Sequence, residues 1–323
     1  WGPPDCGISD FFQEDLTGDG RGDLCFTVNS GYSKQPRQIF IYDPFNDKFI
    51  TSAPSGTSYA KISLFDLDDD GKMEILCNIN ACGNVADTLG IPYSDYSAWL
   101  KLYDSKLRLL FPPIEFPGFR SSIQSIPMKR NDTTYILVLF NHTGPQDLAP
   151  KLMLYNTEGK LIQERQIENA SKNNRALIAA DNGFYIFTAT ESLSVFNNNL
   201  CPIQKTQLII GREVIPKLMD LDKDGDEEFL FIKPDKHELI IYRDNFNTKE
   251  ALTISAGAKG NPMVIKELLR DGKPYIFFRY GNQYSILSYS LSPLYFLKYP
   301  VYLIIGLSVF GFISLIQYHY AYR

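Results

Sequence analysis

A nine-residue acidic pattern occurs three times in the chain, and it restricts the fold more than any other feature. The copies read DLTGDGRGD at residues 15–23, DLDDDGKME at 66–74 and DLDKDGDEE at 220–228. The first two begin 51 residues apart and the last two 154 residues apart, which is close to three further steps of the same length. Each copy precedes an apolar run of the kind that forms a β-strand. This spacing predicts a repeat architecture with about 50 residues in each unit.

A second repeat interleaves with the first and consists of short apolar strands that end in an aromatic side chain. Its copies are IFIYD, LKLYD, LMLYN, LSVFN and LIIYR, which begin at residues 39, 100, 152, 193 and 239 and lie on average 50 residues apart. The aromatic residues are Tyr42, Tyr103, Tyr155, Phe196 and Tyr242. A weaker sixth copy covers 284–288. Four copies close with Asp or Asn, which start turns, so each predicts a strand followed by a tight turn.

Weaker versions of the acidic turn lie between these strands, at residues 129–140, 181–189 and 269–278. Each unit therefore reads as four strands in about 40–50 residues, the size of one blade of a β-propeller. We predict an all-β fold, a β-propeller with six blades in this sequence; in the intact protein either a seventh blade is completed by residues before Trp1 or the ring closes at six. A two-sheet sandwich explains the alternation of apolar and polar residues equally well, but it gives no reason for the period.

Composition and motifs favour a binding protein over an enzyme or a nucleic-acid-binding protein. Hydrophobic residues make up 44% of the chain and aromatic residues 14%, which allows a sizeable core of strands. The net charge is −5 and the sequence has no cluster of basic residues, which argues against nucleic acid as a partner. The sequence contains no GxSxG, P-loop, GxGxxG or HExxH motif, so we predict no catalytic residues in it.

The acidic loops suit calcium, which takes six to eight oxygen ligands. Side chains at loop positions 1, 3, 5 and 9 converge, the glycine at position 6 allows the sharp turn, and position 7 offers its carbonyl oxygen. Magnesium is disfavoured because it keeps its own waters. The predicted ligands are Asp15, Thr17, Asp19, the Arg21 carbonyl and Asp23 in the first loop, Asp66, Asp68, Asp70, the Lys72 carbonyl and Glu74 in the second, and Asp220, Asp222, Asp224, the Asp226 carbonyl and Glu228 in the third.

These loops resemble the calcium-binding FG-GAP or VCBS repeats of integrin-like β-propellers, over about residues 8–290. The resemblance implies that each ion sits in a hairpin loop within a blade and stiffens it. The weak turns depart from the pattern at Asn131, Asp181 and Asp271, which puts calcium there in doubt. Because such weak sites suit a compartment with millimolar calcium, the resemblance also implies a location outside the cytoplasm.

Residues 300–318, PVYLIIGLSVFGFISLIQY, predict one transmembrane helix. The segment holds no charged residue and its 19 residues match the length that spans a bilayer. Tyrosines lie at both ends, as in the aromatic belts of membrane helices. We therefore expect residues 1–291 to form the extracytoplasmic propeller, 292–299 a juxtamembrane linker and 319–323 the start of the cytoplasmic region.

The run at 292–320 is similar to the junction between propeller and membrane helix in bacterial membrane sensor histidine kinases. The resemblance implies a kinase domain after residue 323, a homodimer formed through the parent protein, and an unknown extracellular ligand or protein partner that the propeller senses. An integrin-like adhesion protein without a kinase domain is the alternative. A propeller enzyme such as a polysaccharide lyase ranks third.

Three further features carry expectations about sites. The loop between Ala81 and Trp99 is either a ligand-binding loop or an ordinary surface excursion. Cys77 and Cys82 either pair as a short disulfide or pack as small apolar side chains. The RGD at residues 21–23 is treated as a coincidence, because the calcium loop needs its aspartate.

Overall fold

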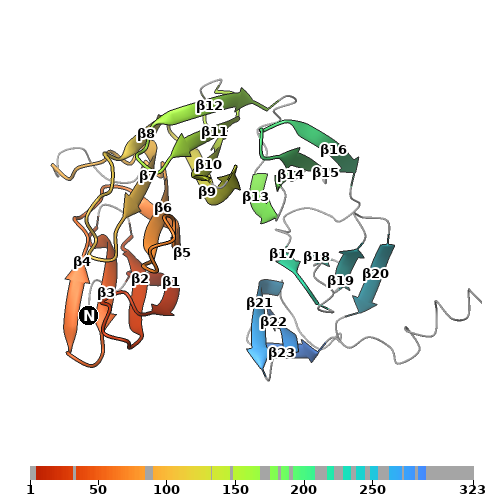
Figure 1. Cartoon of the computed structure of the whole chain (residues 1–323), viewed down its shortest axis with the longest axis horizontal. Helices are drawn as coiled ribbons and strands as arrows, with labels where there is room; N and C mark the ends of the chain where they lie inside the picture. The colour runs from red at the N-terminus through yellow and green to blue at the C-terminus, as the bar shows by residue number, and fades with distance from the viewer. Residues whose placement is uncertain are drawn as a thin grey trace, which may run out of the picture. The chain divides into compact units, whose positions relative to one another are not determined.

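The described part of the chain consists of β-strands joined by turns and loops. The computed structural model describes residues 5–31, 34–83, 90–131, 133–145, 148–167, 175–180, 183–188, 192–207, 217–221, 228–233, 238–243, 248–253, 262–270, 273–280 and 283–288. These residues hold 23 strands and no helix (Figure 1). The chain divides into two units, residues 1–215 and residues 216–323. The prediction of an all-β fold is confirmed.

The first unit contains four antiparallel sheets, each made of four consecutive strands. Its strands are β1 (Gly7–Glu14), β2 (Asp23–Asn29), β3 (Arg37–Asp43), β4 (Lys48–Thr51), β5 (Ser58–Phe65), β6 (Glu74–Asn80), β7 (Ser97–Tyr103), β8 (Ile114–Pro117), β9 (Ser121–Arg130), β10 (Thr133–His142), β11 (Lys151–Asn156), β12 (Leu161–Gln166), β13 (Arg175–Ala180), β14 (Gly183–Thr188), β15 (Ser192–Asn197) and β16 (Pro202–Gln207). Within each sheet the strands lie side by side in chain order.

The second unit contains one four-stranded and one three-stranded antiparallel sheet, again with strands in chain order. Its strands are β17 (Lys217–Met219), β18 (Glu228–Lys233), β19 (Glu238–Arg243), β20 (Thr248–Thr253), β21 (Pro262–Arg270), β22 (Lys273–Tyr280) and β23 (Gln283–Ser288). The repeated strands of the sequence fall on β3, β7, β11, β15, β19 and β23, the third strand of every sheet. The predicted four-strand unit is therefore confirmed for five of the six sheets.

Neighbouring sheets of the first unit pack face to face through apolar cores. One core joins the first and second sheets around Ile41 and Ile62, a second joins the second and third around Leu100 and Val138, and a third joins the third and fourth around Leu154. The second strands β2, β6 and β10 are consequently buried over most of their length. Strand β6 is buried on both faces, since it lies between two cores. Sheets of this kind, stacked in chain order, are compatible with propeller blades.

In the first unit, the turn after the third strand of each sheet is built by an Asp or Asn, as the sequence predicts. Asp104 Oδ1 accepts hydrogen bonds from the backbone N–H groups of Lys106 and Arg108, both at 2.9 Å. Asp43, Asn156 and Asn197 hold the equivalent turns in the same way. The short side chains of Asp and Asn accept hydrogen bonds from backbone N–H groups of their own turn and lose little conformational freedom in doing so. This explains why Asp and Asn recur at these positions.

Polar side chains also join one sheet to the next. The Tyr59 N–H donates to Asn29 Oδ1 and Asn29 Nδ2 donates to the Tyr59 carbonyl, both at 2.9 Å. Asp10 accepts a hydrogen bond from the Ile62 N–H at 3.0 Å. These directional bonds hold the first two sheets in one position relative to each other, which apolar packing alone does not do.

Two expectations concern the cysteines and the membrane helix. Cys77 is buried, Cys82 is exposed and both are free thiols, so the disulfide alternative is not what the structure has. No helix among the described residues is long and apolar enough to cross a bilayer. The linker 292–299, the predicted span 300–318 and the segment 319–323 lie outside the described residues. The blade total in the intact protein stays a prediction.

Candidate metal-binding loops

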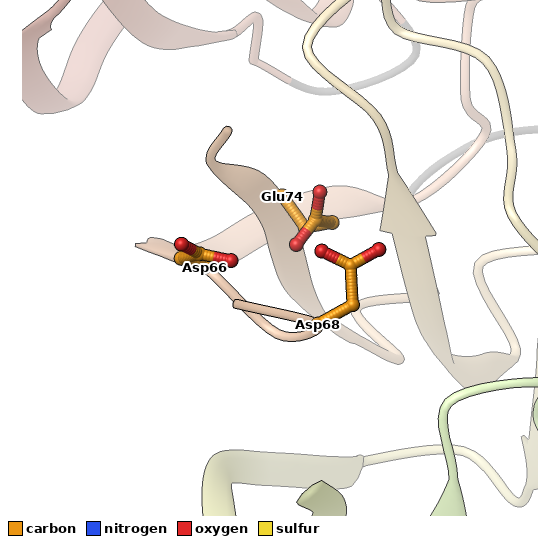
Figure 2. A group of neighbouring side chains, drawn as sticks. All are labelled: Asp66, Asp68 and Glu74. Carbon is orange, nitrogen blue, oxygen red and sulfur yellow. The ribbon is translucent and has the colours of Figure 1, made fainter. Parts of the chain in front are cut away.

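The second acidic loop brings three of its predicted ligands together. Oxygen atoms of Asp66, Asp68 and Glu74 lie within 4.8 Å of one another at the turn between β5 and β6 (Figure 2). Asp66 is half-buried, Asp68 is exposed and Glu74 is buried. The cluster thus has an inner wall formed by the sheet and an open side toward solvent. A divalent cation held by oxygen ligands suits such an arrangement.

Hydrogen bonds within the loop place these carboxylates. The backbone N–H groups of Asp70 and Gly71 donate to the two carboxylate oxygens of Asp66, at 3.1 and 2.9 Å. Gly71 has a φ of 83°, a left-handed conformation that explains the glycine at position 6. Asp66 therefore stabilises the turn by accepting hydrogen bonds from two of its backbone N–H groups.

Glu74 closes the loop from within the sheet. Its Oε2 accepts a hydrogen bond from the Leu67 N–H at 2.8 Å, and its side chain is only 8% exposed. Burial raises the pKa of Glu74, and the charges of Asp68 and its acidic neighbours add to the rise, although the hydrogen bond from Leu67 opposes it. The carboxylate is thus held where a nearby cation would favour its charged form.

Asp70, a predicted ligand, takes a different partner. Its carboxylate forms an ion pair with the ammonium of Lys72, and this contact lowers the pKa of Asp70. Neighbouring Asp69 pairs with Lys129 of β9 at 3.1 Å. Two lysines therefore neutralise the two aspartates that stand outside the three-carboxylate cluster.

The first acidic loop satisfies its carboxylates with backbone donors. Asp15 accepts hydrogen bonds from the N–H groups of Gly18, Asp19 and Gly20, at 2.7, 3.1 and 2.8 Å. Asp23 Oδ2 accepts from the N–H groups of the second and third loop residues, at 2.9 and 2.7 Å. Position 3 is Thr17, which adds no charge. The loop is folded by its own hydrogen bonds.

Other predicted features of this first loop have structural outcomes. The Arg21 guanidinium lies over the ring of Phe45, 4.6 Å from its centroid. Asp23 is 2% exposed, so the RGD sequence does not present its carboxylate to a partner, in line with the expectation.

The third loop is described only at its ends. Asp220 and Glu228 flank it, and Glu228 Oε2 accepts a hydrogen bond from the Leu221 N–H at 2.8 Å. The predicted ligands Asp222, Asp224 and Asp226 lie outside the described residues, as do the weak turns at Asp181 and Asp271. Asn131 is exposed in the hairpin between β9 and β10, with a φ of 50°.

One feature common to all three loops was missed by the sequence reasoning. The acid at position 9 accepts a hydrogen bond from the backbone N–H at position 2, a buried leucine in every copy: Leu16, Leu67 and Leu221. The invariant Asp-Leu start of the three copies was the available signal. The ninth residue therefore has a structural task that does not depend on an ion.

The described residues of the long loop between Ala81 and Trp99 are held by hydrogen bonds to one another and to β7. The Gly83 N–H donates to the Asp95 carbonyl at 2.9 Å, and Trp99 Nε1 donates to the Ser94 carbonyl at 2.9 Å. Beneath it lie two fully buried cationic side chains, Arg37 and Lys101. Sequence reasoning did not single out either of them.

A serine–histidine pair in the third sheet has a structural setting. Ser121 Oγ lies 3.0 Å from His142 Nδ1 and 3.1 Å from the Pro117 carbonyl. Both side chains are buried at the paired ends of β9 and β10. Ser121 Oγ thereby links the turn before β9 to the end of β10.

Comparisons with known proteins find similarity in structure alone. No protein-family model matches the chain, and no curated protein matches it in sequence. The solved structure of BBS1N in complex with ARL6DN, soaked with mercury, has a TM-score of 0.54 and 11% identity, and covers 88% of this chain and 94% of that one. Raptor of Chaetomium thermophilum has a TM-score of 0.53 and 10% identity, over 83% of this chain and 23% of that one. These neighbours have β-propeller-like folds. At such low identity the likeness shows the fold alone.

Proposed function

We propose that this chain is a non-catalytic recognition domain of the β-propeller type, in which a calcium ion stiffens the loop at residues 66–74. The observation that carries the proposal is the cluster of Asp66, Asp68 and Glu74 within 4.8 Å. Three carboxylates at this separation repel one another, and a dication removes that cost. Calcium also accepts the irregular oxygen geometry that a loop offers.

The ion stiffens a loop that already folds without it. The hydrogen bonds made by Asp66 and Glu74 hold the turn, so the metal adds rigidity on the exposed side, where Asp68 stands. The first loop, with its threonine and its saturated Asp15, gains less from a cation. We therefore expect the loop at 66–74 to bind calcium more tightly than the loop at 15–23.

Calorimetric titration of the EDTA-treated full chain with calcium tests the proposal. Asp68→Asn removes one predicted ligand charge and is expected to weaken the binding event of this loop by at least about tenfold, since a charged oxygen ligand is lost. Asp69→Asn is the matched control, because it removes the same charge from the adjacent residue, which pairs with Lys129 and lies outside the cluster. Equal affinity of the two variants, or no binding by the wild type, would refute the site.

The finer proposal is an extracytoplasmic sensor of a membrane histidine kinase, tethered by the helix predicted at 300–318. Its support is the resemblance of residues 292–320 to the kinase junction and the calcium chemistry of the loops. Sequencing the gene beyond the codon for Arg323 decides the matter: a phospho-accepting histidine and an ATP-binding region are expected. A gene that ends within about 30 codons would instead favour the integrin-like adhesion protein.

The recognition role has one further support. The similar structure of BBS1N was solved in complex with ARL6DN, so a fold of this type serves there in a complex with another protein. For this chain we expect the partner to be an extracellular ligand or protein, bound through loops such as that between Ala81 and Trp99.

A further inference from the structure

A lysine ammonium lies fully buried between the first two sheets. Lys101 of β7 is 0% exposed, and its Nζ lies 3.3 Å from Ser55 Oγ. Among the described residues, no carboxylate lies within ion-pair distance of this nitrogen. Aromatic faces surround it instead: the centroid of the Tyr93 ring is 3.7 Å away and that of Tyr59 is 5.7 Å away. A buried ammonium with these neighbours keeps only part of the stabilisation that water gives it.

The segment at residues 90–96 forms the outer cover of this ammonium. Tyr93 places its ring on Nζ, and the same ring meets Trp99 edge-on at 5.3 Å. The Gly56 N–H donates to the Pro92 carbonyl at 3.1 Å, and a side chain at Gly56 would meet the Tyr93 carbonyl at 2.6 Å. The segment therefore packs directly on the connection between β4 and β5.

A second buried cation, Arg37, contacts the same segment through the carboxylate of Asp95. Arg37 Nη1 lies 3.9 Å from Asp95 Oδ2, and both side chains are almost completely buried. The Arg37 guanidinium also donates to the carbonyls of Gly56 and Gly31, at 2.7 and 3.1 Å. Two positive charges thus lie beneath a segment whose described residues bring one negative charge, Asp95.

The titratable groups around Lys101 differ in how they respond to pH. Burial lowers the pKa of Lys101 to about 8, although the neighbouring Cys77 thiol raises it. Burial raises the pKa of the nearby thiols and phenols of Cys25, Cys77, Tyr59 and Tyr103, which stay neutral. The remaining groups that face this region are Tyr93 and Asp95 of the segment, Arg37 of β3 and Asp10 of β1, which acts on Cys77.

Linkage fixes the direction of the effect. When Tyr93 covers the ammonium, Lys101 loses its proton more readily than a lysine in water, whose pKa is about 10.4. When the segment lifts, water reaches Nζ and the pKa returns toward that value. Between these two pKa values the lifted state binds more protons, so packing of the segment is weakest at and below the pKa of the covered amine and strengthens as the pH rises above it.

We propose that packing of residues 90–96 on Lys101 is coupled to the release of one proton, so that this segment loosens as the solution is acidified and tightens as it becomes alkaline. The coupling needs neither calcium nor a ligand, so it stands independently of the proposed metal site. It makes the anchored part of the long loop sensitive to pH.

Hydrogen exchange of the wild-type full chain in EDTA tests the proposal without any substitution. Exchange of amides in residues 90–96 is measured between pH 6.5 and 9.5 and corrected for the intrinsic rate. Below about pH 8 the protection factor of these amides is expected to stay constant, because Lys101 is protonated whether or not it is covered; above about pH 8 it is expected to rise by up to about tenfold per pH unit, the slope for one proton. Amides of β10 serve as the internal reference and are expected to stay constant. A pH-independent ratio between the two regions would overturn the proposal.

Fluorescence of Trp99 identifies the group that titrates. In a Trp1→Phe background Trp99 is the sole tryptophan, since the chain has two. Its emission is expected to shift with one transition centred at about pH 8, because it contacts both Tyr93 and Ser94. Lys101→Met should abolish the transition, and Tyr93→Phe, which keeps the ring, should retain it. A transition that survives in Lys101→Met would assign the effect to another group and refute the proposal.

Discussion

Glu74 combines two tasks that depend on different properties of the same side chain. Its hydrogen bond to the Leu67 N–H needs an acceptor oxygen, whereas its part in the predicted ion site needs a negative charge. A substitution that keeps the shape and removes the charge separates the two tasks. The same reasoning applies to Glu228 and the Leu221 N–H in the third loop.

We predict that Glu74→Gln and Glu74→Ala differ in stability and agree in metal binding. Without calcium, Glu74→Gln should cost little, because the amide oxygen still accepts the Leu67 N–H. Glu74→Ala should lower the free energy of unfolding by about 1–3 kcal/mol, since a buried N–H loses its partner. Both should lose calcium at the 66–74 loop. Urea denaturation in EDTA measures the first effect and calorimetric titration the second; equal stability of the two variants would contradict the assigned hydrogen bond.

At the scale of the strand and its turn, the Asp or Asn at the end of each third strand of the first unit acts locally. Asp104 holds its turn through the N–H groups of Lys106 and Arg108, and it also pairs with the Arg108 side chain. Because all these contacts lie within five residues, the turn forms independently of the packing between sheets.

We predict that Asp104→Ala lowers the free energy of unfolding by about 1 kcal/mol, since it removes two backbone hydrogen bonds from a turn close to the surface. Lys106→Ala is the control, because this exposed side chain leaves the backbone donor in place. Urea denaturation of the two variants measures the difference. A loss as large in Lys106→Ala would show that the carboxylate of Asp104 is not what holds the turn.

The elements that the sequence predicts best are those with local signals. The aromatic-Asp ends predict the third strands, and the acidic turns predict the starts of β2, β6 and β18, because the turn residues stand next to the strands they shape. Arg37 and Lys101 were not predicted to be buried. In a single strand a cation among apolar residues indicates the solvent face, and its burial here depends on the neighbouring sheet and on residues 90–96, which lie elsewhere in the sequence.

The candidate metal site likewise has some features that the sequence predicts and others that it does not. The sequence pattern correctly brings Asp66, Asp68 and Glu74 together, because their spacing follows from one tight turn. It does not distinguish Asp70, whose partner is the side chain of Lys72, or the first loop, whose carboxylates are saturated by backbone N–H groups. Those outcomes depend on which hydrogen-bond donors lie next to each carboxylate in the folded chain. The pattern of acidic residues does not contain that information.

For the molecule as a whole, calcium is predicted to raise thermal stability. An ion that binds the folded state alone at 100 times its Kd stabilises it by about 2.7 kcal/mol. A domain of this size responds by about 2–4 °C per kcal/mol. Differential scanning calorimetry with and without calcium measures the shift in Tm. The shift should shrink in Asp68→Asn and persist in Asp69→Asn; no shift in the wild type would contradict a calcium-stiffened fold.

Each described sheet is assembled from one uninterrupted stretch of chain, with its strands side by side in the order of translation. A duplication or deletion in the gene that spans a whole stretch of this kind would leave every remaining ladder of hydrogen bonds intact. Such a molecule can change its length during evolution in steps of one sheet, while the buried contacts between adjacent copies need only be remade at a single seam.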